Sequence, residues 1–242
     1  MKHIKKSAPP QQLISWAAAN AGLPSLRYGH GGFPHPAVHK SLIAEQGCIC
    51  AYTMIRIDES TSHVEHLKPQ TVSRKEENPS ETADYRNIVA CYPKQHIAGD
   101  PPVKFGAIFR GEAWDPVKFL SPLNAACEAR IRFGTDGKVR PWKSTDAGAK
   151  WTIGTLALDA SSLTEYRRAA IEARGVSLAA DEPLTRKEAQ RIVAGICTRN
   201  TDGRFHPYCV AIKHAAEEYL RLIEKKAKRR NYVRASQKRG RK

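Results

Sequence analysis

The sequence predicts an α+β protein in which a small mixed segment lies between helical regions. Within residues 47–115, stretches that alternate β-branched and aromatic residues are separated by polar turn sequences. Before and after this segment, apolar residues recur at helical spacing. We therefore expect an N-terminal helical segment at 1–46, a mixed core at 47–115, a mixed and then helical region at 116–223, and a basic tail at 224–242.

Two helices are predicted before the core. PPQQLISWAAANAG has proline near its start, glycine at its end and apolar residues between, which is typical of a short helix. GHGGFPHP is predicted as a loop. HPAVHKSLIAEQG is predicted as a second helix that ends at Gly47.

The core is predicted to begin with a hairpin. CICAYTMIRI has strand-like alternation, DESTS has turn chemistry, and HVEHL would be the returning strand. Residues 69–83 are polar and are predicted as a loop, whereas ADYRNIVACY is predicted to start a helix that PKQHIAGDPP ends.

Short strands and then helices are predicted downstream. VKFGAIF, ARIRFG and KVRPW are strand-like, with TDGK as a turn. Four helical patterns follow, in DAGAKWTIGTLAL, SLTEYRRAAIEAR, PLTRKEAQRIVAGIC and PYCVAIKHAAEEYLRLIEKKAKRR. The last should extend into the tail, whose end, ASQKRGRK, is predicted to be disordered.

The charge of the chain favours a polyanionic partner. Its 242 residues include 40 Lys and Arg against 24 Asp and Glu, a formal net charge of +16. Ten of these cations lie in residues 225–242, and contacts to nucleic acid are expected there from Lys225, Lys226, Arg229 and Arg230. A merely solvated tail is the alternative. No apolar run or leader predicts a membrane span or signal peptide, so the expected location is cytoplasmic.

The stretch SHVEHLKPQ carries the residues with the clearest chemistry. Phosphodiester hydrolysis needs a base that deprotonates water and a cation that neutralises charge on the phosphate. His66 has the residue type for the base, and Glu65 supplies hard oxygen ligands. Adjacent strand residues point to opposite faces, so a shared site requires the strand to end or kink here, which Pro69 permits.

Residues 47–115 resemble the HNH, or ββα-metal, endonucleases. The resemblance lies in GCICAY, VEHLKP and YRNIVAC. It implies a ββα-metal core with Glu65 as a metal ligand, His66 as the general base, Asn87 orienting that base and His96 as the second ligand. The implied cofactor is a divalent metal, Mg²⁺ or Mn²⁺.

The second metal ligand has alternatives. His96 follows Pro93, which should end or kink the helix that presents it. His63, Asp84 and Asp100 therefore stay open as candidates.

More narrowly, the chain is similar to the PtuB-like HNH proteins of Septu and retron antiphage systems. The similarity reaches about residue 175 through a Leu-Asp-x-x-x-Leu-x-x-x-Arg pattern that ends at Arg167. It implies a DNA endonuclease that is the effector of a defence complex with a PtuA-like ATPase partner, as a homo- or hetero-oligomer. Lys68 and Arg110 would contact phosphate.

The cysteines depart from the pattern of this family. Many HNH proteins bind a structural zinc through two CxxC pairs, but Thr53 and Lys94 stand where the partners of Cys50 and Cys91 would be. A structural Zn²⁺ is therefore not expected, and these cysteines are predicted to be buried. The loss also supports an alternative function, a catalytically decayed HNH module that binds nucleic acid or bridges a complex. A basic RNA- or ribosome-associated protein is a third interpretation, which leaves the Glu-His-x-x-Pro element unexplained.

Overall fold

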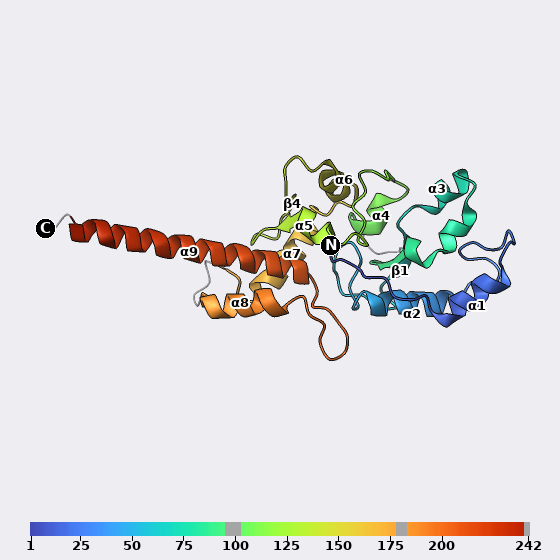
Figure 1. Cartoon of the computed structure of the whole chain (residues 1–242), viewed down its shortest axis with the longest axis horizontal. Coiled ribbons are helices and arrows are strands. Elements are labelled where there is room, and N and C mark those ends of the chain that lie inside the picture. The colour runs from blue at the N-terminus through green and yellow to red at the C-terminus, as the bar shows by residue number, and fades with distance from the viewer. Residues whose placement is uncertain (95–102, 178–182, 240–242) are drawn as a thin grey trace.

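The computed structural model describes residues 1–94, 103–177 and 183–239, and within them the predicted α+β class is confirmed (Figure 1). In chain order the elements are α1 (Gln11–Ala19), α2 (His35–Glu45), β1 (His63–His66), α3 (Gln70–Lys75), the 3-10 helices η1 (Pro79–Ala83) and η2 (Tyr85–Asn87), β2 (Ile88–Cys91), α4 (Gly106–Arg110), α5 (Cys127–Arg130), β3 (Ile131–Phe133), β4 (Val139–Pro141), α6 (Ala147–Thr155), α7 (Ser161–Glu172), α8 (Arg186–Gly195) and α9 (Cys209–Arg239).

The first sheet pairs β1 with β2, antiparallel, so that His63 lies opposite Cys91 and His66 opposite Ile88. The predicted hairpin partner at residues 48–57 and the predicted helix at 83–92 are both wrong. All four residues of β2 are buried, which favours an extended strand in the core over a helix with one exposed face. Residues 48–57 instead form a compact turn in which Ile49 and Arg56 make an isolated antiparallel bridge.

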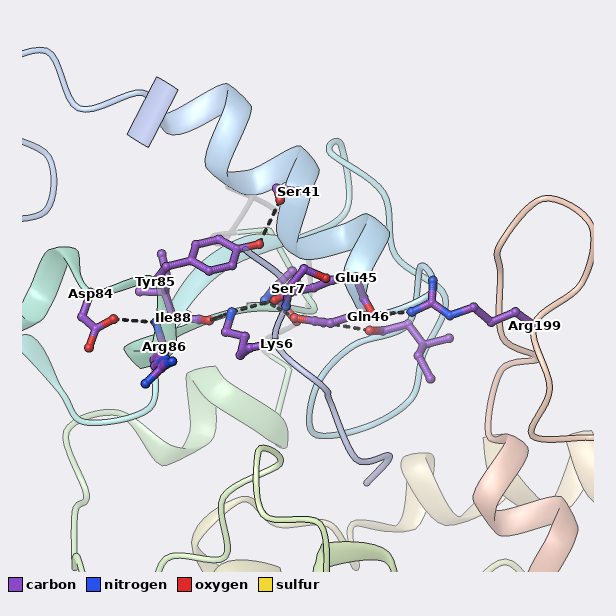
Figure 2. Close-up of polar contacts among 12 residues, drawn as sticks. Lys6, Ser7, Ser41, Glu45, Gln46, Asp84, Tyr85, Arg86, Ile88 and Arg199 are labelled. Carbon is purple, nitrogen blue, oxygen red and sulfur yellow. Dashed lines mark hydrogen bonds and ion pairs between the residues drawn. The ribbon is translucent and has the colours of Figure 1, made fainter. Parts of the chain in front are cut away.

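The free edge of β2 is covered by side chains (Figure 2). The Gln46 amide accepts a hydrogen bond from the Ala90 N–H at 2.7 Å and donates one to the Ala90 carbonyl at 2.9 Å. Lys6 donates to the Ile88 carbonyl at 2.8 Å and pairs with Glu45 at 2.6 Å. These contacts replace a third strand and hold β2 in place against β1.

The connection from β1 to β2 was predicted to be a loop at 69–83, but it contains α3 and η1. Pro69 occupies the N-cap position of α3, where its fixed φ of −56° suits the approach to a helix. This short helix faces the end of β1 and forms part of the candidate site described below.

Downstream, the predicted hairpin at 131–141 is confirmed as β3 and β4, joined by a turn in which Gly137 has a φ of 76°. The strand predicted at 103–109 is wrong, because Gly106–Arg110 forms α4. Arg167 of the sequence pattern is buried and donates to the Gly137 and Leu158 carbonyls at 2.7 and 2.8 Å. The conformation around this hairpin therefore depends on Arg167.

The helices predicted near the N-terminus and after residue 143 are confirmed as α1, α2 and α6 to α9. One apolar core runs from Met1 to Ala211, and a second cluster lies among α7, α8 and the first half of α9. α1, α2, α3 and β1 lie at one end of the long axis, and α9 projects toward the other (Figure 1). α9 continues to Arg239, through most of the segment predicted to be disordered. None of the helices in the described ranges has both the length and the apolar composition needed to cross a membrane.

Candidate active site

A cleft of about 680 Å³ opens at the end of β1, between α3 and α4. Its walls include His63, Glu65, His66, Gln70, Arg74 and Arg110. β1 ends at His66, directly before the segment that leads into Pro69 and α3. The side chains of Glu65 and His66 therefore reach the same cleft although they are adjacent in a strand.

Arg110, at the end of α4, binds the residues of β1 that form one wall of the cleft. Its side chain is 1% exposed, and Nη2 lies 2.5 Å from Glu65 Oε1. The same guanidinium donates to the carbonyls of His66 and Leu67 at 2.5 and 2.7 Å. Buried charges are tolerated where they are paired and hydrogen-bonded, as here. Arg110 was predicted to contact phosphate, which stays a prediction; in the structure Nη1 and Nη2 hold Glu65 and the end of β1, while Nε has no hydrogen-bond partner among the described residues.

Glu65 has a second neighbour on its open side. His63 Nε2 lies 3.6 Å from Glu65 Oε2, and His63 Nδ1 lies 2.5 Å from the Pro93 carbonyl. Burial lowers the pKa of His63, but the Glu65 carboxylate and the Pro93 carbonyl outweigh it, so that this pKa is raised above its usual value. Arg110 binds Oε1 and His63 Nε2 faces Oε2, which as a carboxylate oxygen suits a hard divalent ion.

The His66 ring is fixed from one side. Its Nε2 lies 2.9 Å from the Thr82 carbonyl, which can only accept, so Nε2 carries the hydrogen and Nδ1 has the lone pair in the neutral ring. Tyr28 packs against the ring in a T-shaped contact, with 4.7 Å between the centroids. Burial lowers the pKa of His66 below its usual value, although the Thr82 carbonyl opposes the shift. The ring is therefore neutral near pH 7, as a general base must be.

Asn87 acts on the main chain beside His66. Its side-chain oxygen accepts from the Lys68 N–H at 2.8 Å, and its nitrogen donates to the Lys68 carbonyl at 3.2 Å. Among the described residues, the polar partners of the His66 ring are the Thr82 carbonyl and Gln70. Asn87 therefore fixes the chain two residues after His66, and any effect on the orientation of that ring is indirect.

The cationic residues predicted to bind nucleic acid differ in their partners and in their distance from the cleft. Lys68 is paired with Glu76 and Glu81 at 2.5 and 2.6 Å, so its charge is neutralised within the protein. Lys225, Lys226 and Arg229 are exposed on α9, whereas the side chain of Arg230 lies outside the described part of the structure. Because α9 points away from β1 and α3 along the long axis, these residues do not join the cleft (Figure 1).

The four candidates for the second metal ligand lie in different places relative to the cleft. His96 and Asp100 lie outside the described residues. Asp84 accepts a hydrogen bond from the Arg86 N–H at 2.8 Å as the N-cap of η2 (Figure 2). It lines a different pocket, whose walls include residues 6–9. His63 is the candidate that shares the cleft with Glu65.

Arg74 and Gln70 were not predicted as site residues. Both come from α3, where a spacing of four residues places them on one face, and both line the cleft. Arg74 is exposed, so its guanidinium is accessible to a phosphate. The signal in the sequence was the Pro69 that begins α3, but these residues were assigned to a loop.

Cys50 and Cys91, the latter at the end of β2 opposite His63, contact one another. Cys50 and Cys91 are fully buried, and the Tyr92 N–H points at Cys50 Sγ at 3.4 Å. Burial raises the pKa of Cys50, but hydrogen bonds with Cys91 and Thr53 outweigh it and lower that pKa below its usual value. Thr53 therefore occupies the place of a thiol beside Cys50, while Lys94 is exposed to solvent. Within the described ranges, no cluster of three or more His, Cys, Asp or Glu is suited to hold a metal ion.

Compared with known proteins, the chain matches no family model and no curated sequence.

Proposed function

We propose that this protein is a metal-dependent endonuclease of the HNH type that hydrolyses phosphodiester bonds of DNA. The observation that carries the proposal is the His66 ring, a neutral imidazole in a cleft with Nε2 held by the Thr82 carbonyl and Nδ1 left as the basic atom. Beside it lies Glu65, a carboxylate that lines the cleft with Oε1 bound by Arg110 and Oε2 facing His63.

In this mechanism His66 Nδ1 accepts the proton of the attacking water, and the bond to Thr82 stabilises the imidazolium that forms. The contact of Nδ1 with Gln70 at 3.4 Å is long enough for a closer water to replace it. Glu65 would hold the divalent cation, while Arg110 keeps that carboxylate in place. When bound, the cation neutralises charge on the phosphate and on the leaving oxygen.

A nucleic acid substrate is supported by the charge of the chain and the placement of its cations, and the choice of DNA rests on the resemblance to HNH endonucleases. Arg74 lies at the cleft, where it can contact the scissile region, whereas Lys225, Lys226 and Arg229 lie on α9 and would contact a distant part of a long duplex. The net charge of +16 adds a long-range attraction that salt should weaken.

We further propose that the nuclease is the effector of an antiphage complex and that an ATPase partner restrains it. This part rests on the resemblance of VEHLKP and YRN to PtuB-like proteins. Co-purification with an ATPase encoded by the neighbouring gene tests it directly. If no such gene is present, the defence role loses its support, while the nuclease proposal stands on the cleft.

The nuclease activity is tested by cleavage of supercoiled plasmid in Mg²⁺ or Mn²⁺, comparing the wild type with His66→Ala and His206→Ala. His206 is a half-buried histidine outside the cleft and serves as the matched control. Loss of a general base should slow cleavage by at least about 100-fold. Equal rates for the wild type and His66→Ala would exclude His66 as the base. If the wild type binds DNA but cuts in neither metal, even with the ATPase, a decayed binding module is the better interpretation.

A further inference from the structure

His63 and Glu65 lie on the same face of β1, because side chains two residues apart in a strand point to the same side. Both line the cleft beside His66, and both are partly buried, with side chains 17% and 15% exposed. At this degree of burial, neighbouring atoms restrict the rotamers of both side chains. Their mutual arrangement is therefore set by the sheet.

The Pro93 carbonyl determines which nitrogen of His63 is available. A carbonyl only accepts, so at 2.5 Å from Nδ1 it requires the hydrogen on that atom. Nε2 is then the nitrogen that faces Glu65 Oε2. A histidine that gives one N–H to a main-chain carbonyl and directs its other nitrogen at a carboxylate has the arrangement of metal-ligating histidines.

The gap between Nε2 and Oε2 has the size of a metal site. At 3.6 Å it exceeds a normal hydrogen bond. Two neighbouring ligands on one cation, each about 2.1 Å from it, are separated by about 3.0 Å in an octahedral site and about 3.4 Å in a tetrahedral site. A divalent ion bound by both atoms would therefore need to bring them closer by only a few tenths of an ångström, within reach of small side-chain movements.

We propose that His63 Nε2 is the second protein ligand of the metal held by Glu65, and that this nitrogen makes the site prefer Mn²⁺ and the heavier transition metals to Mg²⁺. The inference rests on the proposed nuclease function and specifies its cofactor. Imidazole suits transition metals, whereas Mg²⁺ demands oxygen ligands. With two ligands from β1, the other positions of the ion are open to water and to phosphate oxygens, as phosphodiester hydrolysis needs.

The test measures metal binding apart from cleavage. Mn²⁺ binding to the whole protein is followed by calorimetry and by the Mn²⁺ electron paramagnetic resonance signal, and Mg²⁺ is added as competitor. The variants are His63→Gln, Glu65→Gln, His63→Asp and the control His206→Gln. His206 is a matched control because its Nδ1 also contacts a proline carbonyl, that of Pro207 at 2.7 Å, but it lies outside the cleft.

His63→Gln and Glu65→Gln should each weaken Mn²⁺ binding by at least about tenfold, while His206→Gln should leave it unchanged. His63→Asp should retain metal binding but shift the preference toward Mg²⁺, because it restores an all-oxygen set. That shift separates ligation from a structural role, which would lower the affinities for both metals alike.

The inference is refuted if His63→Gln binds Mn²⁺ with an affinity within about twofold of that of the wild type. Such a protein that still cuts DNA would keep the nuclease function and lose only the His63 ligand. In contrast, Mn²⁺ binding that depends on both His63 and Glu65, in a protein that cuts no nucleic acid, would support the metal site and refute the nuclease.

Discussion

Replacing Arg110 with methionine should lower the free energy of unfolding by more than the loss of an exposed ion pair would. Methionine keeps most of the aliphatic volume but removes the guanidinium that binds Glu65 and two main-chain carbonyls. The change therefore leaves a largely buried carboxylate without its cation. It also leaves the His66 and Leu67 carbonyls without their donor.

The magnitude follows from burial. Breaking a buried ion pair costs about 3 to 5 kcal/mol, and an unsatisfied buried carbonyl about 1 to 3 kcal/mol. Glu65 retains 15% exposure, so water entering the cleft offsets part of the sum. We expect a loss of about 3 to 5 kcal/mol in the free energy of unfolding, a large part of the stability of a typical domain.

The assay is urea unfolding followed by circular dichroism, with Arg130→Met as the control. Arg130 binds Asp146 at 2.5 and 2.8 Å, but its side chain is 37% exposed, so its loss should cost about 1 kcal/mol or less. In the double variant Glu65→Gln/Arg110→Met no unpaired charge remains. Its loss should therefore be smaller than the sum of the single losses.

The reasoning is refuted if Arg110→Met and Arg130→Met lose the same stability. It is also refuted if the double variant shows simple additivity, because Glu65 and Arg110 would then be energetically independent.

Two further predictions concern other parts of the molecule. Burial lowers the pKa of His214 to about 4 from 6.5, so between these values the unfolded state binds more protons and stability falls as the pH falls. The wild type should lose up to about 3 kcal/mol of unfolding free energy between pH 7 and pH 4 through this histidine, and His214→Gln should lose correspondingly less in urea titrations. Identical pH profiles would contradict this. Arg74→Ala should raise the KM for a DNA oligonucleotide by about 3- to 10-fold with little change in kcat, whereas Lys75→Ala, outside the cleft, should behave as the wild type. An unchanged KM would remove Arg74 from the substrate site.

Local patterns predicted the longer helices well, but the short helices α3 and α4 and the strand β2 poorly. Helices such as α2 and α7 depend on contacts between residues three or four apart, which the sequence displays directly. The β3–β4 hairpin was predictable because the Asp136–Gly137 turn joins its strands. The pairing of β1 with β2 was not, since the two strands are separated by residues 67–87 and any nearer apolar stretch was an equal candidate.

The same limit applied to the candidate site. Glu65 and His66 were found because the Glu-His-x-x-Pro element is contiguous, and both line the cleft. The role of Arg110 depends on burial and on partners 43 to 45 residues away, so the sequence suggested an ordinary phosphate contact. Arg74 was missed because α3, which presents it, has only six residues and too little periodicity to be recognised.

By itself, the sequence determined the charge, the longer helices and the candidate site residues Glu65 and His66. Only the tertiary structure decided how those residues are used: Thr82 binds the His66 ring, Arg110 pairs with Glu65, and His63 lies beside it. The physical reason is that hydrogen bonds and ion pairs form between atoms that are close in space. In this protein that closeness is created by the antiparallel register of β1 and β2 and by the hydrogen bonds of Arg110, in α4, to the end of β1.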